Sequence, residues 1–520
     1  MKNKGLNELP LLTRRRLLTA IAASPFAAAY GHQGILKAAD ILLGSGTAYA
    51  AAASTPVKYF IEINLRDQWD FMHFLVPPGL ATSSNLKRAE SGEVGKEENR
   101  LCALYQDPKT LTKAANNIYL TDDSKEILPH VGNIAAVETI ELCIGGIHGH
   151  EAANGMRSPG RGFKEGPGKK AMWLGDDANQ TDAGGDEFFY SSSPTPALVH
   201  LNVARQLNAT ARAVALKFLG RADKKHSVYH FPADLSDNGF LRVQSRDQLI
   251  QGFAQSKPVD PLSSSEATIV GQVLKQLDAS YLKQMKYSGD SIKSHQEHQN
   301  SFLARTAKGL QVLDLTLSAE EKDYWSKNVP PESSTAPRMH LWEQCAMASK
   351  LIAADAVTTV AMEFSFDDLH GGRPKKEVTA QGKIVGMCLA RLIADLKAKN
   401  LWDDTMIFIN TTDGGREPYV DSYGDKGKNS MILAGGRVQG GYYGDIRVAK
   451  TDGNVHTYSY HVPEIASGRA VAQGSTDNNG RIANAVAYRT IMQAMGAPAS
   501  IYQDLPDVGK GDALGFMLKS

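Results

Sequence analysis

The sequence predicts an α/β protein with a mostly parallel central sheet, because two apolar, β-branched runs flank one amphipathic segment. The runs are Val357–Phe364 and Thr405–Ile409, and acidic residues follow each of them. The segment between them is long enough for the crossover helix that parallel strands require. Its apolar positions share one stripe, as expected for a helix that packs on a sheet. They are Val385, Leu389, Leu392, Ile393 and Leu396.

The rest of the chain supplies further elements of this kind. Tyr59–Leu65 predicts a buried first strand, and a helix from His130 is expected to lead into a strand at Thr139–Ile144. Ala211–Leu216 predicts another buried strand, and Ile482–Met495 a last helix. Loop and short helix are expected in 110–128, whereas the glycine-rich, polar stretch 436–480 predicts no particular element.

Two segments are expected to interrupt the α/β pattern. Residues 160–196 are poor in aliphatic side chains and predict a long surface loop. Apolar residues at spacings of three and four between Pro258 and Trp325 predict a helical hairpin, which gives a helical insertion at about 258–330. The proline-rich stretch 330–337 then leads back to the main sheet. The whole of 51–520 is therefore expected to form one α/β domain with this insertion.

Charge and composition restrict the classes of partner. The chain has 520 residues, of which 42% are hydrophobic and 22% charged, as in proteins that bury a large core. Lys and Arg number 57 against 56 for Asp and Glu, so no nucleic-acid partner is expected. The four cysteines form no metal-binding pair, and Cys345 and Cys388 lie in helical runs where a small buried side chain is the simplest interpretation.

Residues 1–50 resemble a twin-arginine signal peptide. Arg14 and Arg15 precede a short apolar run, and Ala48-Tyr49-Ala50 offers small residues for cleavage near Ala51. A cytosolic helix with a basic start is the alternative. Since no later run is long and apolar enough to span a bilayer, we expect passage through the Tat translocase to the periplasm or the cell exterior.

Candidate site residues follow the predicted strands. The carboxyl ends of parallel strands meet at one edge, so acidic, imidazole and guanidinium side chains there are expected to converge. Such a set could bind a metal ion. Asp70, after the first strand, is a further candidate ligand, although it could instead be a turn residue with an Asx-type hydrogen bond. The other candidates are Asp367, Asp368, His370, Asp413 and Arg416.

A second cluster of potential ligands follows the strand predicted at Thr139–Ile144. It reads His148-Gly149-His150-Glu151, and His150 is the candidate ligand. Its spacing belongs to no single metal class, and one of the two histidines could instead cap the next helix.

Four motifs, in order, resemble a family of exported proteins that bears a domain-of-unknown-function label and belongs to the alkaline phosphatase and sulfatase superfamily. They are Leu65-Arg66 with Asp70, the FDDLHGG run, the TTDGGREP run and MILAGGRVQGGYYGD. The resemblance implies a three-layer α/β/α fold with a mostly parallel sheet. It also implies that Asp70, His370 with Asp367 or Asp368, and Asp413 bind a metal, and that Arg416 keeps the arginine of a family motif.

The chain departs from this pattern at three places. Asp425-Lys426 stands where the family has Asp-His, and Gly149 stands where it has a serine. The run Arg157–Arg161 only loosely resembles the sulfatase signature, so Ser158 is a nucleophile candidate by analogy alone.

These observations leave two functional hypotheses open. The first is a metal-dependent hydrolase of small anionic phosphate or sulfate esters, using zinc, calcium or manganese. The second is an exported binding or assembly protein that keeps the fold, has lost catalysis and acts on an unknown exported partner. A third interpretation is that the acidic residues after the strands only cap helices. It would explain single residues, but not why acidic and histidine side chains recur at one predicted edge.

Overall fold

The computed structural model describes about half of the chain. The described residues are 57–66, 69–89, 93–94, 103–141, 215–218, 240–243, 246–247, 314–331, 339–365, 373–411, 429–452, 455–472, 482–496 and 513–519. The twin-arginine segment, the loop predicted at 160–196 and most of the predicted insertion lie outside them, so these expectations stay predictions. Among the described helices, none has both the length and the apolar character needed to cross a membrane.

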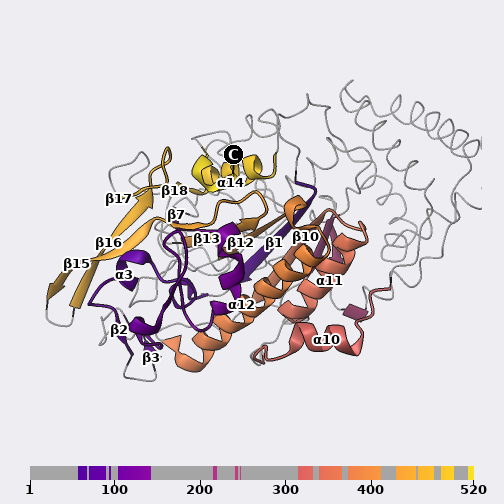
Figure 1. Cartoon of the computed structure of the whole chain (residues 1–520), viewed down its shortest axis with the longest axis horizontal. Coiled ribbons are helices and arrows are strands. Elements are labelled where there is room, and N and C mark those ends of the chain that lie inside the picture. The colour runs from indigo at the N-terminus through magenta and orange to yellow at the C-terminus, as the bar shows by residue number, and fades with distance from the viewer. Residues whose placement is uncertain are drawn as a thin grey trace, which may run out of the picture.

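Nine strands of the described part form the central sheet, with β1 between β10 and β12. The two strands predicted around the crossover helix are therefore not neighbours, because the first strand of the chain lies between them (Figure 1). In spatial order the strands are β14 (Gly441–Tyr443), β7 (Ile134–Glu141), β13 (Asn429–Gly435), β12 (Thr405–Thr411), β1 (Tyr59–Arg66), β10 (Thr359–Ser365), β8 (Ala215–Phe218) and β9 (Phe240–Val243), while β18 (Ile482–Ala483) pairs with β7.

The described sheet is mostly parallel, as predicted. β13 alone runs antiparallel to its neighbours β12 and β7, and the other described pairings of this sheet are parallel. Leu65 of β1 pairs with Phe364 of β10 and with Thr411 of β12. The three central strands therefore end at the same level.

One face of the sheet is covered by α12 and α11. Alternate residues of β1, among them Ile61 and Ile63, join apolar residues of both helices in one buried cluster. Cys345 and Cys388 belong to this cluster and are both buried, which confirms the interpretation of both as small buried side chains. The helices are α10 (Ala319–Ser326), α11 (Leu341–Ala353) and α12 (Lys375–Ala398).

The crossover helix α12 confirms the predicted stripe, whose five apolar side chains are all buried. It begins after Pro374 and ends where Asn400 takes a left-handed conformation, at φ 56°. Asparagine tolerates this conformation, and the backbone N–H of Leu401 closes the end by donating to the carbonyl of Leu396 over 2.8 Å.

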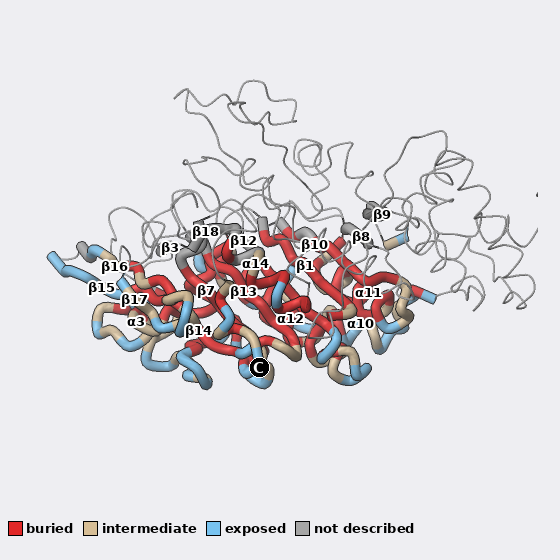
Figure 2. Tube along the Cα trace, turned by 90° about the horizontal axis from the view of Figure 1, so that it is seen from above, coloured by how far each residue is buried: buried red, intermediate tan, exposed pale blue. Residues whose placement is uncertain are grey.

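The other face is covered by α14 (Asn484–Ala494), the helix predicted at Ile482–Met495. Its residues Ile491 and Met492 pack with Phe60 of β1 and Phe408 of β12, which alternate with the residues facing α12. Helices thus lie on both faces of the sheet, and Figure 2 shows the buried core between them in red.

A smaller antiparallel sheet extends from one end of the central sheet (Figure 1). Asp445 ties it to α3, because its carboxylate accepts the backbone N–H of Gly79 over 2.6 Å. These elements are α3 (Pro78–Ala81), β15 (Asp445–Asp452), β16 (Val455–Pro463) and β17 (Ala470–Ala472). The short ones are η2 (Phe71–His73), η4 (Pro108–Thr110), η5 (Lys125–Asn133), η7 (Trp402–Asp404), η8 (Gly515–Met517), β2 (Lys87–Arg88), β3 (Glu93–Val94), β4 (Ala103–Leu104), β5 (Thr112–Lys113), β6 (Tyr119–Leu120) and β11 (Arg373–Pro374).

One sequence-based expectation was wrong in detail. β7 begins at Ile134, so residues 134–138 are strand and not the predicted helix, because the alanines there pair with β13 inside the sheet. The polar stretch 436–480 holds four strands; backbone pairing with neighbouring strands holds β15–β17 although much of β15 is exposed.

Candidate functional site

The candidate site begins at the carboxyl edge of the central sheet. β1, β10 and β12 end there at Arg66, Ser365 and Thr411, and β7 ends at the same edge because it runs in the same direction. The predicted site residues other than Asp70 come after these strand ends in the sequence and lie outside the described residues. They are His150, Ser158, Asp367, Asp368, His370, Asp413 and Arg416.

Asp70 is the one predicted site residue that the structure describes. It precedes η2, four residues after β1 ends, and its side chain does not cap that short helix. The Asx-type turn is therefore not what holds the side chain. Instead, Oδ2 of Asp70 lies 3.1 Å from Nδ1 of His73, with only 1% of the Asp70 side chain and 4% of the His73 side chain exposed.

The ring of His73 packs against an aromatic side chain, and the backbone around it is hydrogen-bonded. The ring of Tyr105 packs against it with 5.3 Å between ring centroids. Thr121 donates its hydroxyl to the backbone carbonyl of His73 over 2.7 Å, and Ser124 donates its own to the carbonyl of Phe74 over 2.5 Å. The turn at 121–124 therefore fixes the backbone at His73 and Phe74.

Asp123, in the same turn, is buried against α12. A Cβ added at Gly382 would lie 2.8 Å from the Cβ of Asp123, so Asp123 fits here only because α12 has a glycine at position 382. Burial raises the pKa of Asp123 to about 6, and the nearby charge of Asp122 adds to the rise. The charges of Lys383, His73 and Lys125 act in the opposite direction, because they favour the charged carboxylate.

The raised pKa of Asp123 predicts a pH-dependent stability. In the unfolded chain the carboxyl titrates at its ordinary pKa of 3.8, so between about pH 4 and 6 the folded state binds the extra proton. Stability therefore falls as the pH rises through this window. Asp123→Asn removes the charge, and we expect it to be more stable than the parent at pH 7.5, by up to about 3 kcal/mol for a pKa rise of this size.

Urea denaturation at pH 4, 5, 6 and 7.5 measures this effect, and the two proteins should converge near pH 4. The neighbouring Asp122→Asn is the matched control, since that side chain is 67% exposed and such changes alter stability by less than about 0.5 kcal/mol. A stability difference between Asp123→Asn and the parent that does not vary with pH would contradict the prediction.

The sequence patterns do not indicate His73, Asp123 or Gln381. His73 follows Asp70 by three residues, a spacing that could have been noticed, because it brings two side chains together across one helical turn. Asp123 and Gln381 carry no comparable sequence signal. Gln381 is buried on α12, and its amide makes no hydrogen bond in the part of the chain that the structure describes.

A second buried carboxylate lies in β7. Tyr442 donates its hydroxyl to Glu138 over 2.6 Å, and Ser430 donates to the same carboxylate over 3.0 Å. Burial and the nearby Glu138 raise the pKa of Tyr442 well above its ordinary value. These bonds join β14 and β13 to β7, so Glu138 has a structural role here.

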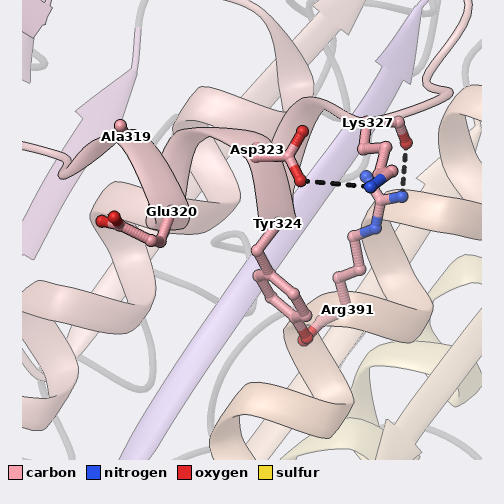
Figure 3. Close-up of a pocket in the computed structure, with 6 residues that line it drawn as sticks. All are labelled: Ala319, Glu320, Asp323, Tyr324, Lys327 and Arg391. Carbon is pink, nitrogen blue, oxygen red and sulfur yellow. Dashed lines mark hydrogen bonds and ion pairs between the residues drawn. The ribbon is translucent and has the colours of Figure 1, made fainter.

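A surface pocket of about 670 Å³ lies between α10 and α12 (Figure 3). Its charged groups already have partners: Lys327 pairs with Asp323 at 3.3 Å, and Arg391 donates to the carbonyls of Trp325 and Lys327, each over 2.6 Å. Arg391 lies in the half of α12 that leads away from the carboxyl edge. The pocket's charges stabilise the end of α10, and we assign it no function.

The described residues alone do not form a metal site, since no three His, Cys, Asp or Glu side chains among them are arranged to bind one ion. Asp70 would need ligands from segments that follow β7, β10 and β12.

Strand order, direction and the helices on both faces define the chain as an α/β protein with a mixed, mostly parallel sheet. Residues 193–479, more than half of the chain, match the family described as "Protein of unknown function (DUF1501)". The chain belongs to this family. No curated protein matches it.

Solved structures show low similarity to the chain. The structure of Ps i-CgsB in complex with k-i-k-neocarrahexaose is 11% identical, over 89% of this chain and 76% of that chain, with a TM-score of 0.33. The phosphonate monoester hydrolase SpPMH from Silicibacter pomeroyi is 11% identical, over 75% and 71%, with a TM-score of 0.29. A protein in the alkaline phosphatase superfamily from Vibrio parahaemolyticus is 8% identical, over 81% and 72%, with a TM-score of 0.27. Scores of this size carry no argument about activity.

Proposed function

We propose that this protein is an exported, metal-dependent hydrolase of phosphate or sulfate esters with an alkaline-phosphatase-like α/β/α fold. One observation carries the proposal. β1, β10 and β12 lie side by side, run parallel and end level at Arg66, Ser365 and Thr411. Each is followed closely by residues of the types that bind metal ions, and β7 ends at the same edge ahead of His150.

The residue types suit a divalent ion. Carboxylates from Asp70, Asp413 and either Asp367 or Asp368 would supply negative charge, and His150 and His370 would supply nitrogen ligands, a mixture that zinc and manganese accept. The surroundings of Asp70 support this role, because its carboxylate is buried against an imidazole, and carboxylate ligands commonly have a polar partner besides the ion. Calcium prefers oxygen ligands alone and fits this set less well.

Each remaining residue has a definite task in the proposal. The ion would polarise the ester and lower the pKa of a bound hydroxyl or water. Arg416 would bind an anionic oxygen of the ester through its planar guanidinium group, which suits phosphate and sulfate. Ser158 is the proposed nucleophile. The substrate class is a small anionic ester, and export would follow the twin-arginine route.

The alternative is a binding or assembly protein that keeps the fold without catalysis. Lys426 favours this alternative, because it stands where the family that the sequence resembles has a histidine. An ammonium group near a cation site would repel the ion. Gly149 also favours this alternative, since it stands where the family has a serine. Arg157 favours it too, since it stands where the sulfatase signature has its nucleophile.

Two measurements on the purified protein separate these functions. Elemental analysis for zinc, manganese, iron and calcium should find at least one of them at a stoichiometric level. A screen of phosphate and sulfate esters with added divalent ions should then show hydrolysis that a chelator abolishes. Absence of both metal and hydrolysis would favour the binding protein and contradict the hydrolase.

A further inference from the structure

The short helix η2 joins a predicted metal ligand to a buried histidine. Asp70 and His73 lie at its two ends, and Oδ2 of Asp70 is 3.1 Å from Nδ1 of His73. The backbone between them is also closed, since the N–H of His73 donates to the carbonyl of Asp70 over 3.3 Å. The two side chains are therefore brought together by one short turn of the backbone.

The position of the imidazole is fixed independently of Asp70. Tyr105 packs on the ring with 5.3 Å between centroids, and Thr121 holds the backbone carbonyl of His73 over 2.7 Å. A ring restrained in this way restrains whatever its nitrogen contacts. The carboxylate of Asp70 therefore faces an imidazole that Tyr105 restrains.

The surroundings of His73 explain why a histidine matters there. In the described part of the chain, its two ring nitrogens make no hydrogen bond that meets strict geometry, and the contact with Asp70 is their one ion-pair contact. For packing against Tyr105 alone, phenylalanine would suit the site better, because it buries no polar atom. The nitrogen facing Asp70 distinguishes histidine from that better packing residue.

We propose that His73 is a positioning residue for Asp70, whose carboxylate it holds in the orientation that binds the divalent ion. This inference rests on the proposed function and adds a residue that the sequence motifs did not indicate. Groups that orient a metal ligand commonly alter metal affinity by about 10–100-fold when they are removed. Substitution of His73 should therefore weaken metal binding without abolishing it.

The test compares His73→Phe, which keeps a ring without nitrogens, with His73→Asn, whose amide can contact Asp70 from a similar place. Zinc affinity of the full-length protein is measured by competition with a chromophoric chelator, and the stability of each metal-free protein by urea denaturation. We expect His73→Phe to lose about 10–100-fold in affinity and His73→Asn to stay within about threefold of the parent. His73→Leu serves as a second nitrogen-free variant if His73→Phe does not fold.

The outcomes separate the two proposals. Parental zinc affinity in His73→Phe, together with loss of zinc in Asp70→Ala, would overturn the positioning role and leave the metal site intact. Unfolding of both nitrogen-free variants, or lowered stability at unchanged affinity, would show a structural role and overturn the inference too. If the parent protein binds no zinc, or Asp70→Ala binds it normally, the metal role of Asp70 fails and the inference fails with it.

Discussion

Alanine at Asp368 or at His370 is expected to abolish the divalent metal content of the purified protein. Both residues follow β10 by a few positions, at the edge where β1 and β12 also end. A site of four or five ligands that loses one carboxylate or imidazole loses charge neutralisation or a coordination position together with much of its affinity. Elemental analysis after dialysis against a metal-free buffer gives the metal content of each variant.

The matched control for this prediction is Asp323→Ala. Asp323 lies on α10, its side chain is 64% exposed, and it pairs with Lys327, so its loss should leave the metal content unchanged. Full retention of metal by both the Asp368 and the His370 variants would remove this site from consideration. Circular dichroism of each variant separates loss of the ion from loss of the fold.

Alanine at Gly440 is expected to destabilise the protein by about 3 kcal/mol, at the upper end of the usual cost of overpacking. An added Cβ would clash with the backbone carbonyl oxygen of Val131 and would lie 2.6 Å from the carbonyl carbon of Gly132. Backbone atoms cannot turn aside as side chains do. The change would therefore separate β14 from η5 and break the bond of Asn116 to the Gly440 carbonyl, now 2.7 Å long.

Gly132→Ala is the control, on the opposite side of the same contact. A Cβ at Gly132 would meet no atom within 4 Å, and we expect a change of less than about 0.5 kcal/mol. Urea denaturation of both variants and the parent measures the difference. Equal stability of the two variants would show that the approach of Gly440 to residues 131–132 is not tight in solution.

The elements that the sequence predicted well are those whose side-chain pattern matches one backbone period. α12 has five apolar residues on one stripe and formed between the two strands predicted around it. β1 is a run of β-branched and aromatic residues and formed within one residue of its expected bounds. β7 was misjudged because its alanines fit a helix equally well, and only pairing with β13 selects the strand. Hydrophobic alternation does not reveal β15 and β16, because backbone pairing between the two strands holds them in place.

The candidate site divides in the same way. Residue types after strand ends predicted ligands, and the structure shows that β1, β10 and β12, the strands before most of these positions, end level at one edge. The partners of Asp70 were not predicted in this way. His73 is local, but Asp123, whose pKa His73 lowers, comes from a chain segment that is remote in sequence.

The sequence by itself determined the α/β class, the crossover helix and the residue types at the strand ends, because local periodicity and residue chemistry need no partner to be recognised. Only the tertiary structure decided that β1 lies between β10 and β12, and that Asp70 is held by His73 beneath Tyr105. Strand order and side-chain contact depend on which surfaces exclude water together, and that choice is made by the whole chain and not by any one segment.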